Sequence, residues 1–146
     1  MESESAAPLA GRVALVTGAS GGIGAGLARM LAAEGARVVL AARRQAALEQ
    51  IADSIRELGG CAVPIAADLT DDASLVNLLE RARTELGPID ILVNNAGFAV
   101  WKPLEATSLA EWDHTFAVKC SCRGLLVCIR AARHAAKGLR ANCQHQ

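Results

Sequence analysis

The sequence contains no tyrosine, and only 3% of its 146 residues are aromatic. Any buried core must therefore be built from alanine and the aliphatic residues, which a composition with 52% hydrophobic residues permits within one domain. Fifteen basic residues balance fifteen acidic ones, so the chain lacks the positive charge typical of nucleic-acid binders and of basic membrane-surface proteins. The composition predicts an ordinary globular domain with neither of those partners.

Long apolar runs are also missing. No run approaches the roughly 18 to 20 residues of a membrane span, and the acidic, polar start MESESAAPLAG is unlike a secretory signal. The cysteines are odd in number and lack both paired Cys-x-x-Cys spacing and a histidine cluster, so we expect reduced thiols and no metal site. They are Cys61, Cys120, Cys122, Cys128 and Cys143. Together these features predict a cytoplasmic protein.

Apolar runs that favour strands alternate with apolar residues at helical spacing. We expect strands at residues 13–16, 37–40, 61–66 and 89–93, and helices whose apolar residues fall within 23–31, 48–58 and 75–86. The first helical pattern consists of Ile23, Leu27, Met30 and Leu31. Strand-helix units of about 30 residues with short connections imply parallel strands, right-handed crossovers and helices on both faces. The sequence therefore predicts an α/β fold with a doubly wound parallel sheet, which binds ligands beyond the carboxyl ends of its strands.

The pattern changes after the fourth expected strand. Ser108 and Glu111 form a capping-box signature before an alanine-rich segment, which predicts a helix from about Leu109 to Ala136. Whether this helix is continuous through residues 120–124 is left open. No further strand follows, so the fourth strand should be an exposed edge of the sheet with apolar surface beside it.

A glycine-rich turn joins the first expected strand to the first helix, with the sequence TGASGGIG at residues 17–24. Gly18 permits a tight turn, Gly22 removes a side chain where a pyrophosphate would approach the backbone, and Gly24 lets the helix pack closely on the strand. The helix N-terminus would supply N–H groups and partial positive charge to phosphates. Such a turn by itself also occurs as a plain connector in glycine-rich proteins.

Two later motifs fall where strands end on the same edge of the sheet. Asp68-Leu69 follows the third strand, and Asn94-Asn95-Ala96-Gly97 follows the fourth. With the glycine turn, these motifs closely resemble the classical short-chain dehydrogenase/reductase family, and the spacing agrees from about Gly11 to Arg133. The resemblance implies the N-terminal half of a Rossmann-type sheet with a nicotinamide dinucleotide as partner.

The resemblance also implies roles for individual residues. In the family, the glycine turn holds the pyrophosphate, the Asp and its following residue contact adenine, and the NNAG segment lies beside the adenosine ribose while its Asn braces the sheet. These roles fall to Gly18, Ser20, Gly22, Ile23 and Gly24, to Asp68 and Leu69, and to Asn95, Ala96 and Gly97. Simpler roles stay open, a helix cap for Asp68 and a turn residue for Asn95.

The end of the second strand bears on the choice of cofactor. An acidic residue there would bind a ribose 2′-hydroxyl, whereas this sequence has Ala41-Ala42-Arg43-Arg44. Arg43 can present a fork of donors to a 2′-phosphate, which favours NADP over NAD. The alternative is that the two arginines are solvated residues at a helix start.

The catalytic residues of the family have no counterpart here. Family members transfer hydride between nicotinamide and a carbonyl or alcohol carbon, with a Tyr and Lys of a YxxxK motif, a Ser and an Asn in the proton transfer. This chain has no Tyr, Lys119 stands where the Asn is expected, and complete members run to roughly 250 residues. His114, His134 and Cys120 lack partners for a triad. We therefore expect no catalytic residue in this chain and no turnover by it.

The expected organisation is a polar tail at 1–10, a partial NAD(P)-binding Rossmann domain at 11–138, and a tail unlike the family at 139–146. In permitted codons, CTG CGG GCG AAT TGT CAA CAT CAG, that tail reads CGRIVNI one nucleotide later, which resembles the family's fifth strand. A genuine alternative ending also stays open. Three functions also stay open. The chain could be the NADP-binding half of an oxidoreductase, a module that binds NADP or pairs with an intact homologue through its open edge, or a fragment without stable function.

Overall fold

The computed structural model describes residues 7–97 and 103–118. Strands and helices alternate along the chain in the predicted order. The elements are β1 (Val13–Thr17), α1 (Gly22–Ala33), β2 (Arg37–Ala42), α2 (Gln45–Glu57), β3 (Cys61–Ala66), α3 (Asp72–Leu86), β4 (Ile91–Val93) and the 3₁₀ turn η1 (Leu104–Ala106). Residues 109–118 are helical.

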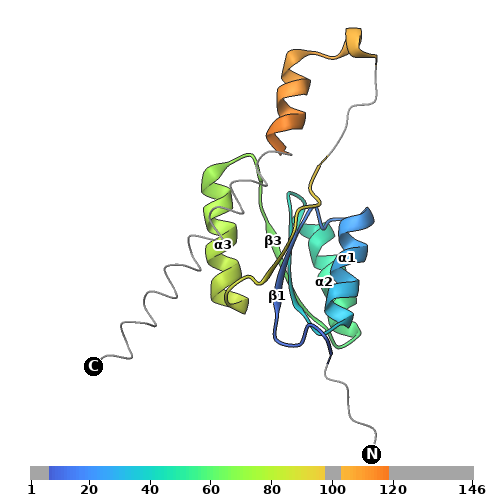
Figure 1. The fold of residues 1–146 in the computed structure, drawn as a ribbon, viewed down its shortest axis with the longest axis vertical. Coiled ribbons are helices and arrows are strands. Elements are labelled where there is room, and N and C mark those ends of the chain that lie inside the picture. Colours follow the sequence, from blue (N-terminus) through green and yellow to red (C-terminus); the bar gives the residue numbers. More distant parts are fainter. Residues whose placement is uncertain (1–6, 98–102, 119–146) are drawn as a thin grey trace, which may run out of the picture.

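In the described residues, four parallel strands form one sheet in the order β3-β2-β1-β4. Helices α1 and α2 cover one face and α3 covers the other, as Figure 1 shows. Because β1 lies in the middle, the chain crosses from β3 back past β1 to reach β4. The predicted α/β fold with a doubly wound parallel sheet is therefore confirmed.

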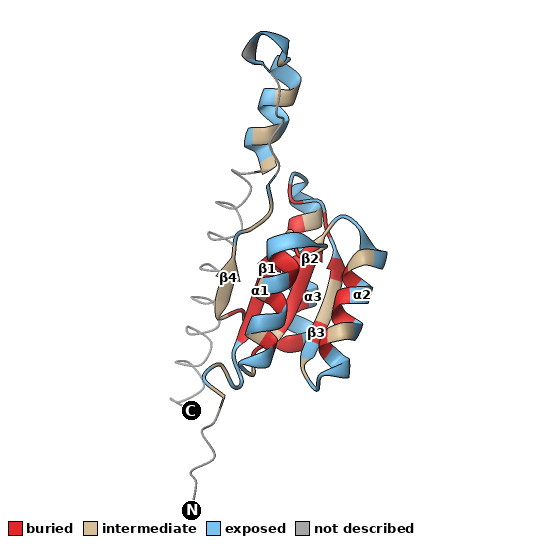
Figure 2. Cartoon of the chain, turned by 90° about the vertical axis from the view of Figure 1, so that its right-hand side faces the viewer, coloured by how far each residue is buried: buried red, intermediate tan, exposed pale blue. Residues whose placement is uncertain are grey.

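The core consists of two apolar layers, one on each face of the sheet. β1 is buried along its whole length and contributes side chains to both layers. Figure 2 shows β1 and β2 as the most buried strands, whereas β4 is intermediate. Among the described residues, the buried hydrophobic side chains are alanine, valine, leucine and isoleucine, as the scarcity of aromatic residues predicts.

Helix α1 buries mainly its small residues. Its buried residues are Gly24, Ala25, Ala28 and Ala32, whereas Ile23 is 75% exposed and Met30 is 66% exposed. Small side chains let the helix backbone approach the sheet closely, and longer ones would hold it away. Of the four large residues in the predicted pattern, Leu31 packs against the apolar layer and Leu27 is partly buried, whereas Ile23 and Met30 face outward.

The fourth strand is shorter than predicted. It begins at Ile91, although Ile89 is buried and the N–H of Asp90 still donates to the carbonyl of Val13 at 2.8 Å, because a side chain supplies the other half of that pairing. The carboxylate of Asp90 accepts a hydrogen bond from the backbone N–H of Val13 at 3.0 Å and lies 3.6 Å from the Arg12 guanidinium. The strand is the last one of the described sheet, as the sequence predicts.

The capping box before residues 109–118 is confirmed. The backbone N–H of Ser108 donates to Glu111 Oε2 at 2.9 Å, and the backbone N–H of Glu111 donates to Ser108 Oγ at 3.3 Å. The predicted continuation of this helix to Ala136, Lys119 and the tail at 139–146 lie outside the described residues. No helix in the described part of the chain is long and apolar enough to cross a membrane.

At the other end of the described chain, residues 7–10 pack on the end of α1. Leu9 contacts the apolar layer beneath α1 and donates its backbone N–H to the carbonyl of Glu34 at 2.9 Å. Cys61, at the start of β3, is an exposed free thiol.

Candidate functional site

A pocket of about 910 Å³ lies beyond the carboxyl ends of β1, β2 and β3. The β1–α1 turn, the end of β2, the residues after β3 and the residues after β4 form its walls, and the helix at 109–118 closes one side. Its lining residues are Gly18, Ser20, Gly21, Ile23, Ala42, Arg43, Arg44, Ala67, Asp68, Leu69, Asn95, Ala96, Gly97, His114 and Val118. Nine of the eleven residues singled out from the sequence therefore lie around one cavity. Gly22 and Gly24 are the two that do not line it.

The backbone of the β1–α1 turn makes close contacts that only glycine permits. A Cβ on Gly24 would lie 2.4 Å from the carbonyl oxygen of Gly18, and a Cβ on Gly18 would lie 2.9 Å from Cα of Ala96. Gly18 and Gly22 also have positive φ angles, of 65° and 52°. A Cβ on Gly22 would meet no atom within 4 Å, so its conformation, and not crowding, calls for glycine.

The N-terminus of α1 lies at the pocket, which Gly21 and Ile23 line. Its N-cap residue is Gly21, which provides no side chain to accept from them, and the first turn carries no acidic residue. Unpaired N–H groups and the positive end of the helix dipole favour an anion at this position. Most helix N-termini receive a side-chain acceptor, as α3 does from Asp71, whose carboxylate accepts from the N–H of Ser74 at 2.7 Å.

Thr17 and Asn95 join the turn to the segment after β4. Thr17 is fully buried. Its hydroxyl donates to the carbonyl of Val93 at 3.2 Å and accepts from the N–H groups of Asn95 and Ala96, each at 3.1 Å. The Asn95 amide donates to the carbonyls of Thr17 at 3.2 Å and Gly18 at 3.3 Å. Asn95 therefore braces the ends of β1 and β4. Sequence reasoning assigned Thr17 no role, although a threonine closing an otherwise apolar strand is a signal for one.

Charged side chains gather on the outer rim of the pocket. Arg43 and Arg44 follow β2, and Asp68 follows β3. The Asp68 carboxylate accepts from the hydroxyl of Thr70 at 2.7 Å and from its N–H at 2.9 Å. These two hydrogen bonds lower the pKa of Asp68, and the nearby Arg43 and His114 side chains add to the effect. Asp68 is thus ionised, and the helix cap of α3 is Asp71 instead.

Two lining residues come from the helix at 109–118, and neither of them was placed in the pocket from the sequence. His114 and Val118 come from the helix at 109–118 and line the same cavity as Asp68 and Leu69. Their spacing of four residues places them on one side of a helix. No local motif marks them, because their place in the pocket depends on the path of the chain after β4.

Comparison with known proteins identifies the family. The family model for short chain dehydrogenase matches residues 12–140. The chain belongs to the short-chain dehydrogenase/reductase family. A metagenomic short-chain oxidoreductase, crystallised in complex with NADP, is 41% identical, with a TM-score of 0.81 over 88% of this chain and 59% of that one. A blue fluorescent protein from a metagenomic library, crystallised with NADPH, is 33% identical, with a TM-score of 0.78 over 84% of this chain and 51% of that one.

Among curated proteins, glycine betaine reductase ATRR of Emericella nidulans is 44% identical over 119 residues, which is 82% of this chain and 9% of that protein. The chain spans less than half the length of this and other curated relatives that it matches. The shared part is the nucleotide-binding half of the family fold.

Proposed function

We propose that this chain is the nucleotide-binding half of a short-chain dehydrogenase/reductase and that its pocket binds NADP(H) in preference to NAD(H). The observation that carries the proposal is the convergence of the glycine turn, Asp68, the segment after β4 and two arginines on one cavity at the carboxyl edge of the sheet. Crystal structures of two relatives were obtained with NADP and NADPH.

The pyrophosphate is assigned to the β1–α1 turn. Its glycines and Ser20 lie against the start of α1, where free N–H groups and the helix dipole favour a doubly charged anion. Hydrogen bonds between Thr17 and Asn95 hold the start of the turn in place. The N–H donors of the turn are therefore in position before any ligand binds.

The adenosine part of the cofactor is assigned to the other end of the pocket. Leu69 and Val118 offer apolar side chains for a purine ring, and the ionised Asp68 accepts hydrogen bonds from an exocyclic amine. Ala96 and Gly97 would lie beside the ribose, where small residues leave room for a sugar. This set of donors, acceptors and apolar walls fits an adenine dinucleotide.

The 2′-phosphate is assigned to the end of β2. Arg43, with Arg44 beside it, presents guanidinium donors to the pocket, and no acidic residue stands at this strand end to bind a 2′-hydroxyl. The fork of an arginine matches a phosphate in geometry and in charge.

The reaction assigned to the intact family fold is hydride transfer between nicotinamide and a carbonyl or alcohol carbon. The chain alone should not catalyse it, since the sequence contains no tyrosine to donate the proton and Lys119 replaces the expected asparagine. Loss of acid-base catalysis removes about 10²- to 10⁴-fold in rate, and loss of oxyanion stabilisation removes more.

A fluorescence titration with NADPH tests the proposal. The purified chain should bind NADPH saturably at one site, and it should show no turnover of alcohols or carbonyl compounds. Absence of saturable binding by a folded sample would refute the assignment of the pocket. Turnover near the rate of a complete enzyme would refute the assignment of inactivity.

A second candidate function is an interaction module located in the cytoplasm, which binds NADP(H) and associates through the open sheet edge with a second copy or an intact family member. The position of β4 at the end of the described sheet favours it. Its three residues are only half-buried.

A further inference from the structure

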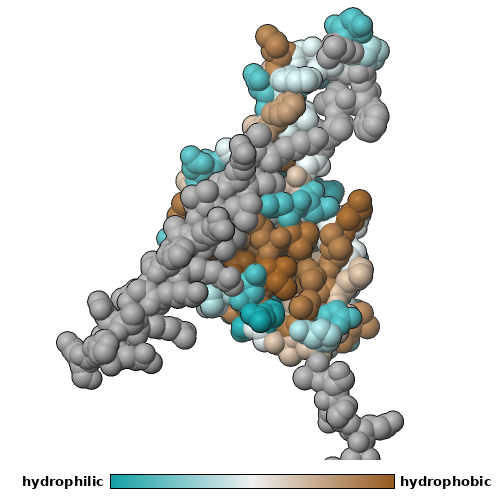
Figure 3. All heavy atoms as spheres, viewed as in Figure 1, coloured by the Kyte–Doolittle hydropathy of each residue, from teal (hydrophilic) through white to brown (hydrophobic). Residues whose placement is uncertain are grey.

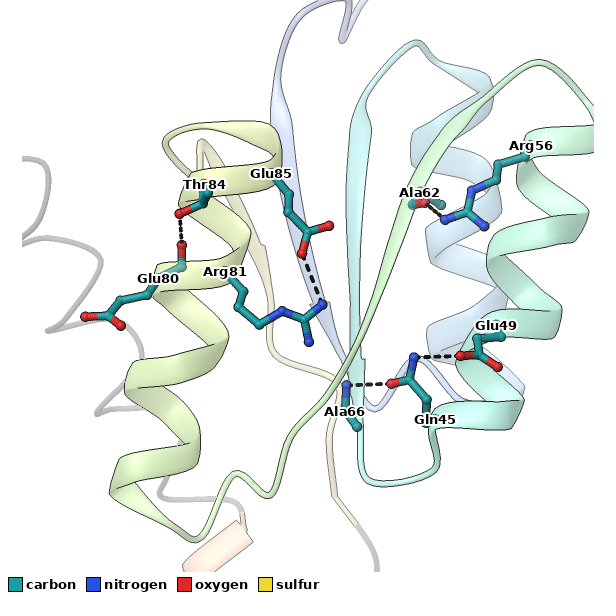
Figure 4. A network of polar contacts seen from close by, with 9 residues as sticks. All are labelled: Gln45, Glu49, Arg56, Ala62, Ala66, Glu80, Arg81, Thr84 and Glu85. Carbon is teal, nitrogen blue, oxygen red and sulfur yellow. Dashed lines mark hydrogen bonds and ion pairs between the residues drawn. The ribbon is translucent and has the colours of Figure 1, made fainter.

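Away from the pocket, several polar side chains of α2 and α3 form hydrogen bonds within the protein, as Figure 4 shows. Gln45 donates to Glu49 Oε1 at 2.9 Å and accepts from the N–H of Ala66 at 3.0 Å. Arg81 donates to Glu85 Oε1 at 3.1 Å. These interactions join parts of the chain to one another.

The carboxylate of Asp68, in the pocket, is oriented through one of its two oxygens. Oδ1 accepts from the hydroxyl of Thr70 at 2.7 Å and from its N–H at 2.9 Å. The N–H of Asp68 itself donates to Ser74 Oγ at 2.9 Å, which ties the segment to the start of α3. Among the described residues, the hydrogen bonds to the carboxylate both end on Oδ1. Oδ2 can therefore accept from a ligand in the pocket that Asp68 lines.

His114 lies on another wall of the same pocket. The pKa of Asp68 is lowered chiefly by the Thr70 hydroxyl, and the His114 side chain adds to the effect, so the imidazole lies near the carboxylate. Val118 lines the pocket one helical turn further on, on the same side of the helix. Figure 3 shows hydrophobic and hydrophilic side chains on this helix, at the top of the view. The helix thus offers the pocket both an apolar side chain and an N–H donor, since an imidazole carries an N–H in either protonation state.

The chemistry of adenine matches a carboxylate beside an imidazole. The Watson–Crick edge of adenine carries the exocyclic amine, which is a donor, next to N1, which is an acceptor. This edge lies on the side of the base away from the ribose. In the proposed binding mode, the β1–α1 turn, the end of β2 and the residues after β4 contact the pyrophosphate, the 2′-phosphate and the ribose. The walls that remain for this edge are the residues after β3 and the helix at 109–118, which carry Asp68 and His114.

We propose that His114 determines base specificity, with its N–H donating to adenine N1 while Asp68 Oδ2 accepts from the exocyclic amine. This inference rests on the proposed cofactor site and adds a residue to it. Hypoxanthine and guanine carry a carbonyl oxygen and an N1–H at these two positions, so an acceptor would face an acceptor and a donor would face a donor. The pocket should therefore select adenine nucleotides over those of the other purines.

A double-mutant cycle between protein and ligand tests the contact. His114→Leu removes the donor, and the 1-deazaadenine analogue of NADPH replaces N1 with a C–H group. In a fluorescence titration, each change alone should lower the affinity by about threefold to tenfold. Both changes together should lower it no further, because they remove the same hydrogen bond. Losses that multiply would overturn the proposal.

Two further variants separate a contact with the base from a structural effect. His114→Gln retains an N–H donor and should keep a preference for NADPH over the analogue. Ala117→Leu, an exposed substitution on the same helix outside the pocket, should change the affinity for neither ligand. If His114→Leu fails to fold, the unchanged chain decides the matter, since it should bind the analogue more weakly than NADPH. Equal affinity of the unchanged chain for both ligands would overturn the contact with N1.

NADH distinguishes a contact with the base from one with the 2′-phosphate. His114→Leu should weaken NADH and NADPH by the same factor, because both contain adenine. A loss confined to NADPH would overturn the proposal and move His114 to the 2′-phosphate beside Arg43. Saturable binding of NADPH by the unchanged chain tests the cofactor site separately, so a failed cycle would leave that assignment standing.

Discussion

The inner wall and the outer rim of the pocket are built in different ways. The inner wall is formed by Gly18 and Asn95 together with the groups directly behind them: Asn95 is hydrogen-bonded to Thr17 and to the carbonyl of Gly18, and a Cβ added at Gly24 would lie 2.4 Å from that carbonyl oxygen. The outer rim consists of charged side chains that reach toward solvent. The two parts have different roles in binding. The inner wall determines where an anion can bind, and the outer rim determines which anion is preferred.

The largest expected effect breaks the inner wall. Gly24→Ala would push a methyl group against the backbone of Gly18, and something must shift to admit it. We expect a loss of about 1–3 kcal/mol in the free energy of unfolding, together with a loss of NADPH binding. Urea unfolding and fluorescence titration measure both.

Gly26→Ala is the matched control. It lies in the same helix, and its added Cβ meets no atom within 4 Å. The substitution should stabilise the chain by up to about 1 kcal/mol, because alanine favours helix. Equal destabilisation by the two changes would show that α1 is not held against the turn.

The next effect concerns the buried hydroxyl. Thr17→Val keeps the shape of the side chain but removes the acceptor of the Ala96 N–H and one of two acceptors of the Asn95 N–H, which keeps the carbonyl of Val93. The expected cost is about 1–3 kcal/mol in the free energy of unfolding. Thr17→Ser retains the hydroxyl and should cost less. If the serine variant proves the less stable of the two, the packing of the methyl group outweighs the hydrogen bonds.

A substitution on the outer rim should leave the free energy of unfolding unchanged and alter the preference between NADPH and NADH. Arg43→Asp replaces a phosphate donor with a carboxylate that repels phosphate and accepts from a 2′-hydroxyl. Affinity for NADPH should fall about tenfold to a hundredfold and the preference should turn toward NADH. Arg83→Asp, an exposed substitution on α3 outside the pocket, is the control. An unchanged cofactor ratio in Arg43→Asp would remove that residue from the site.

The smallest effect is a pH dependence at Asp68. Its folded pKa is lowered, chiefly by the Thr70 hydroxyl, so its ionised form stabilises the fold above the ordinary aspartate pKa of about 3.9 and this stabilisation is lost as the pH falls. Because the group is exposed, Asp68→Asn should cost at most about 0.5 kcal/mol at neutral pH. The difference from the unchanged chain should be constant above about pH 5 and shrink below it. A difference that grows in acid would contradict this account.

The sequence predicted the fold because its strands and helices alternate with short connections, and such patterns leave few topologies. It predicted most of the inner wall because each glycine there answers a local backbone requirement. It did not predict the buried face of α1, since alanines pack there while Ile23 and Met30 face outward. His114 and Val118 could not be predicted either, because they reach the pocket through the path of the chain after β4.

The most direct test is the ratio of the dissociation constants for NADP and NAD, measured by calorimetry on one folded preparation of the unchanged chain. The inner wall should give both ligands a single saturable site. The rim should make NADP bind about tenfold or more tightly, from hydrogen bonds between a guanidinium and the 2′-phosphate. Equal affinities, or no saturable binding of either ligand, would contradict the assignment of this pocket to NADP.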